Sequence, residues 1–460
     1  MFSTSSEQWA SDTFSQAKLG DIRRAKRLVV LASNLSNKLG QSLVQSSTSP
    51  ADIEAAYRFT RNKAIDAQAI AEAGFLATAN RVNQYDCLLA LDDTTSLEFK
   101  HQTVRGEMGH TTSNKNSRGM HAHSVLLFAP EQQHVVGLIE QKRWTRDITL
   151  YGQNNRHATR AYESKESYKW EQASEAMSTR LGSDMGRVIS VCDREADIIE
   201  YLIYKTTRQQ RFVVRSMQSR CIEQSENKLY QYSESLKSAG QRTVSVRQKG
   251  GRKARDACCQ IRYAKVDVKM PANKKGAAVP LYYVGCQEES SNQGLSWHLL
   301  TSEPVTSKEE AERVLAYYEK RWLIEEFHKA WKSGGTQVED LRMQSKENLE
   351  KMVVILAFIA ARLHQLRYLG LNKKEAEKQN CEMVLSPLAW KLLWTKQEKS
   401  PLPKTAPSLY WAYINLGKLA GWHDSKRNGR VGWERLWEGW FKLQTILEGY
   451  ELAKSLDLEM

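Results

Sequence analysis

The chain has 460 residues, and its 67 Lys and Arg residues outnumber its 53 Asp and Glu residues, which gives a formal net charge of +14. This length is too great for one compact core, so we expect about two to four domains. A hydrophobic content of 41% with 13 tryptophans excludes a chain that is disordered throughout. The longest apolar run, 352–361, is far shorter than the ~20 residues that span a bilayer, so we expect no membrane partner.

The seven cysteines include no C-x-x-C pair, which argues against a disulfide framework and against a four-cysteine zinc site. The first residues show no basic region followed by an apolar stretch, so we expect a cytoplasmic protein. Clustered Lys and Arg side chains bind polyanions by releasing the counterions condensed on phosphates. The basic excess therefore favours a nucleic-acid partner, although many proteins are basic for solubility alone.

The first 70 residues have the pattern of short helices. Gly20 and Asp21 separate the first two, and a later helix begins at Ser49 with Pro50 in its first turn. The second helix begins with four basic residues, Arg23, Arg24, Lys26 and Arg27. A small helical domain with a basic helix is one way to bind DNA, and a solvated basic face on a helical cap is the alternative.

From residue 87 the pattern changes to buried strands with a helix between them. The expected helix covers 168–181, and the expected strands cover 87–91, 123–128, 134–140, 188–192 and 211–215. Three consecutive strands followed by a helix and more strands predict an α/β fold, in which a mixed sheet has helices on its faces.

A β-rich, basic segment follows at 216–304. Alternating apolar and polar residues predict strands near 242–247 and 259–269, joined by a turn at 249–251. Arg252, Lys253 and Arg255 make this turn basic. It is either an ordinary charged hairpin tip or a contact to a phosphate backbone.

Acidic residues follow two of the apolar runs. Asp92 and Asp93 come after the first run, and Asp193 comes after the run at 188–192. Carboxylates at adjacent strand ends repel one another unless a cation neutralises them, and oxygen ligands suit Mg²⁺ or Mn²⁺ better than zinc. The alternative is that each Asp only caps the turn that follows it.

One long helix is expected over 308–332, between a capping box of Ser307 with Glu310 and a stop at 334–335. One face of this helix is apolar and suits packing on the sheet, with Leu323, Ile324, Phe327 and Trp331. The opposite face carries, within an arc of ~60°, the residues Tyr318, Arg321, Glu325 and Lys332. An ion pair between Arg321 and Glu325 explains only two of these four.

The rest of the chain is mostly helical. A seam with steps of three and four residues lies near its end, at Trp433, Leu436, Trp440, Leu443, Leu447 and Tyr450. Such a seam either packs on its own domain or forms a contact between two protomers.

The spacing Tyr318-x2-Arg321-x3-Glu325-x6-Lys332 is similar to the Y-R-E-K signature of the IS-four family of bacterial cut-and-paste transposases. Further blocks that resemble this family extend over essentially the whole chain: Tyr57-Arg58-Phe59, Asp92-Asp93-Thr94-Thr95-Ser96, Ser117-Arg118-Gly119, Cys192-Asp193-Arg194-Glu195-Ala196-Asp197, Trp297-x2-Leu300-Thr301-Ser302-Glu303-Pro304 and Trp437-Glu438-Gly439-Trp440.

The resemblance implies an RNase H-like catalytic core with a triad of Asp93, Asp193 and Glu325, and it selects Asp93 over Asp92. It also implies three domains: an N-terminal helical DNA-binding domain at 1–70, a catalytic domain at 71–370 with the β-rich insertion at 216–304, and a C-terminal helical dimerisation domain at 371–460.

The resemblance further implies contacts with DNA. Tyr318, Arg321 and Lys332 would lie near the cleaved phosphate, and Trp297 matches a tryptophan that stacks on a flipped base, a contact worth roughly 1–3 kcal/mol. The alternative for Trp297 is a sheet-core tryptophan. The remaining implied DNA contacts are Arg215, Arg23, Arg24 and Arg27.

The implied activity is metal-dependent excision of DNA through a hairpin on the transposon end, followed by joining of its 3′-OH to target DNA. Two Mg²⁺ ions per active site, with Mn²⁺ as a substitute, would be the cofactors. The partners would be double-stranded DNA and a second protomer, and the place of action the bacterial nucleoid.

Three other functions stay open at this point. A nuclease that cuts without joining shares the triad, and a transposase-derived regulator shares the DNA-binding parts. A glycosidase with paired carboxylates is the third, and the net charge counts against it. A nitrogen-ligand metal site at His121 and His123, with His101 and His110 nearby, lacks a spaced third ligand.

Overall fold

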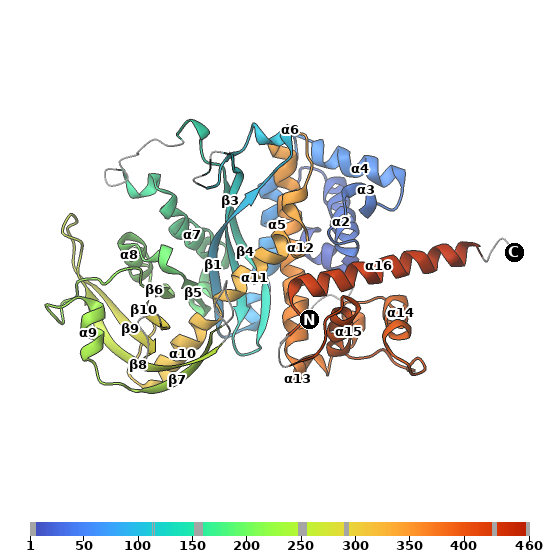
Figure 1. Ribbon diagram of the computed structural model, residues 1–460. Helices are drawn as coiled ribbons and strands as arrows, with labels where there is room; N and C mark the ends of the chain where they lie inside the picture. The colour runs from blue at the N-terminus through green and yellow to red at the C-terminus, as the bar shows by residue number, and fades with distance from the viewer. Residues whose placement is uncertain are drawn as a thin grey trace.

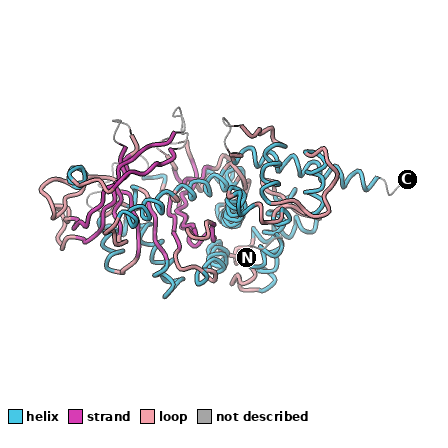
Figure 2. Tube along the Cα trace, turned by 90° about the horizontal axis from the view of Figure 1, so that it is seen from below, coloured by secondary structure: helices cyan, strands magenta, loops and turns pink. Residues whose placement is uncertain are grey.

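The computed structural model describes residues 6–112, 114, 116–150, 160–246, 255–288, 294–425 and 430–456. Figures 1 and 2 both show the strands gathered in one half of the molecule, with the N-terminal and C-terminal helices in the other.

The described strands form a single sheet of ten, in the order β2-β3-β1-β5-β6-β10-β9-β8-β7, with β4 also paired to β3. In chain order they are β1 (Leu88–Glu98), β2 (Gly109–His110), β3 (Arg118–Ala129), β4 (His134–Trp144), β5 (Val188–Cys192), β6 (Arg211–Arg215), β7 (Gly240–Val246), β8 (Arg255–Val268), β9 (Val279–Glu288) and β10 (Ser296–Thr301).

Five of these strands form the RNase H-like core. β4, β3 and β1 are antiparallel neighbours, and β5 and β6 then continue the sheet parallel to β1. The expected strands at 188–192 and 211–215 are confirmed residue for residue, because each is a short apolar run between helices. The sequence therefore predicted the mixed sheet correctly.

The β-rich insertion extends this sheet. β10 pairs with β6 of the core on one side and with β9 on the other, so β7 to β10 are continuous with the core strands. The predicted basic turn with Arg252 and Lys253 lies outside the described residues. Arg255, at the start of β8, forms an ion pair with Glu288 of β9.

Helices cover both faces of the sheet. The helices are α1 (Ser6–Phe14), α2 (Ile22–Asn37), α3 (Leu43–Ser46), α4 (Pro50–Arg61), α5 (Ala67–Ala79), α6 (Gln102–Arg105), α7 (Lys169–Leu181), α8 (Ile199–Thr207), α9 (Leu229–Ser235), α10 (Lys308–Glu319), α11 (Trp322–Lys332), α12 (Lys346–Leu371), α13 (Lys373–Ala376), α14 (Pro387–Gln397), α15 (Leu409–Leu419) and α16 (Trp433–Leu456). α10, α11 and α12 pack on one face of β1 and β5, while α7 and α8 pack on the other.

The predicted single helix over 308–332 is wrong in one respect. It is two helices, α10 and α11, separated at Lys320 and Arg321. The amides there bond three residues back, as Arg321 N does to Tyr318 O at 3.0 Å, and this tightens the turn. The capping box at Ser307 and the stop after Lys332 are as predicted.

The N-terminal helices begin where the sequence indicated. The Asp21 side chain accepts a hydrogen bond from Arg23 N and caps α2, and Ser49 caps α4 with Pro50 in the first turn. The predicted domain limits at residues 70 and 370 stay predictions. α5 crosses the first of them, and α12 ends at Leu371, next to the second.

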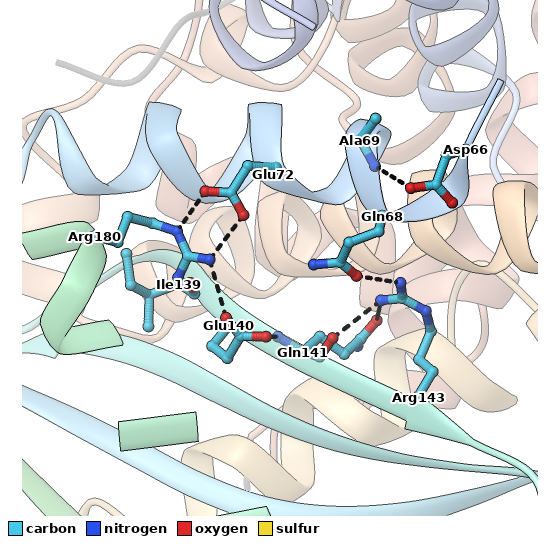
Figure 3. Close-up of polar contacts among 9 residues, drawn as sticks. All are labelled: Asp66, Gln68, Ala69, Glu72, Ile139, Glu140, Gln141, Arg143 and Arg180. Atoms are coloured by element: carbon cyan, nitrogen blue, oxygen red, sulfur yellow. Dashed lines mark hydrogen bonds and ion pairs between the residues drawn. The ribbon is translucent and has the colours of Figure 1, made fainter. Parts of the chain in front are cut away.

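A network of polar side chains, with Arg180 and Glu140 buried, ties α5 and α7 to the edge strand β4 (Figure 3). Arg180 of α7 donates two bonds to Glu72 of α5, at 2.9 and 2.8 Å, and a third to Glu140 of β4 at 3.0 Å. Arg143 of β4 donates to the Gln68 side chain of α5 at 3.0 Å. These planar, charge-assisted contacts fix the orientation of α5, the helix that follows the N-terminal segment.

The long helix α12 lies at the centre of the molecule (Figure 1). It is the one described helix long and apolar enough to cross a membrane, yet 89% of its apolar window is buried inside the protein. Several of its polar side chains are buried and face different parts of the fold. Gln365 donates to Val136 O of β4 at 2.7 Å, and Lys351 donates to Thr60 O and Asn62 O at the end of α4, at 2.8 and 2.9 Å.

The C-terminal helix α16 contains the residues of the predicted seam. Leu443 is fully buried, and Leu436, Trp440 and Leu447 pack with it against α14 and α15. Tyr450, the last seam residue, is 44% exposed. The C-terminal end of α16 extends away from the body of the molecule (Figure 1). Most of the seam thus packs on its own domain, and only its outer end is free for another contact.

The Lys351→Met substitution tests the contact between α12 and the N-terminal helices. We expect it to destabilise the protein by about 1–3 kcal/mol, because it removes the Lys351 donor from the buried Thr60 carbonyl and one of the two donors from the Asn62 carbonyl. Urea denaturation followed by tryptophan fluorescence measures this change. Lys374→Met, on an exposed position of α13, is the control and should change stability by about 0.5 kcal/mol or less. An equal effect of both substitutions would contradict this role of Lys351.

Candidate active site

The two aspartates of the predicted triad lie side by side at one end of the sheet. β1 and β5 are parallel and in register, with Leu91 opposite Val191, so Asp93 and Asp193 follow at equivalent positions on adjacent strands. Asp93 lies within β1, which continues to Glu98, so the expectation that it follows the end of a strand is wrong. Asp193 directly follows β5, as predicted.

The alternation of strand side chains separates Asp93 from Asp92. Asp93 is on the face of β1 that α11 covers, with 20% of its side chain exposed. Asp92 points to the opposite face and is fully buried, where its Oδ2 lies 3.9 Å from Cys192 Sγ. Of the two, only Asp93 therefore shares a face with Asp193 and α11.

Glu325 and Arg321 approach the aspartates from α11 and the turn before it. Arg321 Nη1 lies 4.0 Å from Asp93 Oδ2, and the same guanidinium forms an ion pair with Glu325. The Glu325 side chain is 42% exposed, so it borders solvent. The ion pair predicted from the helical spacing is present, and it lies at the carboxylates and not on a remote solvated face.

Burial and crowding make the aspartates hard to ionise together. Burial raises the pKa of Asp93 to about 7, Arg321 opposes this shift, and repulsion from Asp193 and Glu325 adds to it. Burial also raises the pKa of Asp193, against the opposing effects of a hydrogen bond from Glu195 N and the charge of Arg321. The site thus holds more negative charge than Arg321 alone compensates.

These residues fit a divalent cation. Within the described ranges, no three His, Cys, Asp or Glu side chains stand close enough to hold a metal ion as they are. The Arg321 guanidinium occupies the space next to Asp93 and Glu325. Carboxylate oxygens are the ligands that Mg²⁺ and Mn²⁺ prefer, and the raised pKa of Asp93 shows that further positive charge would be favourable there.

Three other predicted residues gather beside the carboxylates. Trp297, at the start of β10, packs edge-on against Tyr318 of α10, with 5.2 Å between the ring centroids. Arg215, at the end of β6, donates to Ser296 O at 2.9 Å. Tyr318 is only 5% exposed, whereas Trp297 is half-buried at the edge of the core. Trp297 is therefore the more accessible of the two aromatic rings.

Lys332, the last residue of α11, contacts β1 beyond Asp93. Its Nζ donates to Ser96 O at 2.7 Å and pairs with Glu339 at 3.3 Å.

His328 is a site residue that the sequence analysis missed. Its Nδ1 lies 3.8 Å from Asp93 Oδ2, and burial, with Lys332 and Arg321 nearby, lowers its pKa to about 3, so it is neutral. Its position three residues after Glu325, on the same side of α11, was the signal that could have found it.

The N-terminal arginines are not brought to the triad. Arg24 donates to Leu19 O at 2.8 Å, and Arg27 pairs with Asp52 at 3.1 Å, so both make contacts within the N-terminal helices. Arg23 is exposed on α2.

Two of the histidines considered as a metal site pack on aromatic rings. His121 stacks on Trp144, and the His123 ring centroid is 4.5 Å from that of Trp170.

Comparison with known families gives two matches. Residues 6–65 match the family described as transposase DNA-binding, and residues 132–362 match the family described as transposase DDE domain. The second match covers about half of the chain and includes Asp193 and Glu325, while Asp93 precedes it.

A solved structure is also similar to this chain. It is the cryo-EM structure of the piggyBac transposase synaptic complex with hairpin DNA, aligned over 87% of this chain and 74% of that chain at 9% sequence identity, with a TM-score of 0.32. A similarity this distant adds nothing to the argument from the fold and the site.

Asp93→Asn tests the raised pKa of Asp93, which burial causes first and the neighbouring carboxylates increase. The raised pKa of Asp93 means that wild type loses stability as pH rises through about 7, because the folded state must release a proton that it binds better than the unfolded chain does. Asn cannot ionise, so the variant avoids this loss. In EDTA, the melting temperature of the variant minus that of wild type should therefore be larger at pH 8 than at pH 5, by about 2 °C or more.

Differential scanning fluorimetry at the two pH values measures this difference. Asp340→Asn, at an exposed carboxylate, is the control. Its melting temperature minus that of wild type should be the same at pH 5 and at pH 8. If Asp93→Asn behaves as Asp340→Asn does, the pKa of Asp93 is not raised in the folded protein.

Proposed function

Since the chain belongs to the transposase DDE domain family, we propose that it is a DNA transposase that excises an element from DNA and joins the freed 3′-OH ends to target DNA. The observation that carries this proposal is the placement of Asp93 and Asp193 at equivalent positions on adjacent parallel strands, with Arg321 linking Asp93 to Glu325. Three carboxylates converge there on one end of an RNase H-like sheet.

In this proposal Asp93, Asp193 and Glu325 hold divalent ions, Mg²⁺ or Mn²⁺, two per site. Bound there, such ions supply a lowered pKa for an attacking water and charge stabilisation for the leaving 3′ oxygen. If the carboxylates held ions, the Arg321 guanidinium would be free to leave Glu325 and bind a DNA phosphate, which its planar geometry suits.

Each chemical step exchanges one P–O bond for another. Water first cleaves one strand and frees a 3′-OH, which then attacks the opposite strand and leaves a hairpin on the element end. A second water opens the hairpin, and the 3′-OH attacks target DNA. In this proposal Trp297 stacks on a base that leaves the duplex at the hairpin, and its half-buried position beside Tyr318 supports this role.

The finer assignment is to the IS-four family, near the transposase of transposon Tn-five, and it rests on the spacing of Tyr318, Arg321, Glu325 and Lys332. In this assignment Arg23, Arg24 and Arg27 of α2 bind the element ends, after Arg24 and Arg27 exchange their present partners for phosphates. Two protomers hold two ends in a synaptic homodimer in the bacterial nucleoid, and the exposed end of α16 is the surface available for pairing.

Glu325→Gln is the direct test. We expect it to lower cleavage of DNA carrying the flanking element ends by roughly 10³-fold or more, because it removes a metal ligand, while end binding stays near the wild-type level. A gel assay with labelled DNA and Mg²⁺ measures cleavage, and a gel-shift assay measures binding. Arg321→Ala should instead weaken the contact with DNA at the active site and slow the steps that follow the first cleavage.

The products decide between the functions. A hairpin that appears with wild type and is absent with Glu325→Gln supports the transposase. Simple nicking would indicate a nuclease without strand transfer, and binding without cleavage in Mg²⁺ or Mn²⁺ would indicate a regulator. Cleavage by Glu325→Gln at the wild-type rate would contradict the proposed metal site.

A further inference from the structure

A buried polar cluster, which we call the Glu326 triad, lies directly beside Glu325 and consists of Glu326, Arg367 and Trp433. The Glu326 carboxylate on α11 accepts a hydrogen bond from Trp433 Nε1 of α16 at 2.6 Å and another from Arg367 Nη1 of α12 at 2.7 Å. The Arg367 guanidinium also lies 4.4 Å from the centroid of the Trp433 ring. Each member comes from a different helix, and only 12% of the Glu326 side chain and 5% of the Arg367 side chain are exposed.

Two further contacts join the α16 region to α11. Before α16 begins, the Arg430 guanidinium lies 5.4 Å from the ring centroid of Trp322, the first residue of α11. Beyond the other end of α11, a Cβ atom placed on Gly335 would lie 2.8 Å from Trp437 Cζ2, so the indole of Trp437 packs directly on that glycine. The start of α16 and the residues before it thus contact α11 at its beginning, its middle and its end.

The break at Lys320 and Arg321 makes these contacts important for the position of α11. Because α11 is a separate helix of 11 residues, α10 does not by itself fix its rotation. Glu325 and Glu326 are consecutive residues of one helix, so any rotation of α11 that moves one carboxylate also moves the other. Within the described residues Glu325, with 42% of its side chain exposed, forms an ion pair with Arg321, whereas Glu326 is held by partners on two other helices.

We propose that the Glu326 triad is the positioning device of the active site: the seating of α16 on Glu326 sets the rotation of α11 and so places Glu325 opposite Asp93 and Asp193. This inference rests on the proposed function, in which Glu325 is a metal ligand. Glu326, Arg367 and Trp433 are positioning residues, and the C-terminal segment acts on the site through an intramolecular contact, separate from any contact between protomers.

Trp433→Phe tests the triad because it removes the indole N–H and keeps an aromatic ring for Arg367. Trp440→Phe is the matched control: Trp440 is one of the next tryptophans of α16, and its Nε1 has no hydrogen-bond partner within the described part of the chain. We expect Trp433→Phe to weaken Mn²⁺ binding to the complex with end DNA, measured by calorimetry, by about 10-fold, and to slow single-turnover cleavage by about 10-fold or more.

Hydrogen exchange of the amides of α11, followed by mass spectrometry, supplies a readout that does not depend on activity. It should speed up in Trp433→Phe and stay unchanged in Trp440→Phe, with end-DNA binding equal in both. Should Trp433→Phe fail to fold, Glu326→Gln decides by the same readouts, because it keeps an acceptor oxygen for both donors and removes the carboxylate charge, which pairs with Arg367 and also lies 3.6 Å from the exposed Lys329.

The outcomes separate this inference from the proposed function. If Glu325→Gln still cleaves DNA, the proposed function fails, whatever the tryptophan variants do. If Glu325→Gln is inactive, but Trp433→Phe and Glu326→Gln match Trp440→Phe in Mn²⁺ affinity and in α11 exchange, the inference is overturned and the proposed function stands.

Discussion

The crowding of negative charge at one end of the sheet is the constraint on which the rest of the site depends. Asp93 and Asp193 stand on adjacent strands because β1 and β5 are parallel and in register. Burial and mutual repulsion raise the pKa of Asp93 to about 7, and Arg321 supplies only part of the compensating charge. A site built this way is unfavourable for the protein alone, and cations relieve the repulsion. The ion pair of Arg321 with Glu325 is part of that compensation.

The buried helix α12 holds the parts of the molecule around this site. Its Lys351 binds the end of α4, its Gln365 binds β4, and its Arg367 binds Glu326 of α11. Buried charged and polar groups are costly unless paired, so each of these contacts fixes one element in one orientation. The N-terminal helices, the sheet and α11 are therefore positioned by a common element, and α16 joins them through Trp433.

Much of this architecture was predictable from local patterns. Apolar runs gave β5 and β6 residue for residue, and the caps at Ser49 and Ser307 marked helix starts. The break at Arg321 was not predictable, because its residues suit a continuous helix and tertiary packing decides the turn. Nor did the sequence indicate that the insertion continues the core sheet, since the pairing of β10 with β6 joins residues far apart in the chain. Asp93 could be chosen over Asp92 by resemblance, and the structure adds the physical reason, opposite faces of one strand.

The most direct test of the central claim is a crystal structure of the complex with end DNA and Mn²⁺, with anomalous diffraction data. Our account predicts anomalous peaks between Asp93, Asp193 and Glu325, with the Arg321 guanidinium moved off Glu325 toward a DNA phosphate. Peaks elsewhere, with the Arg321–Glu325 pair intact, would show that these carboxylates are not the metal site.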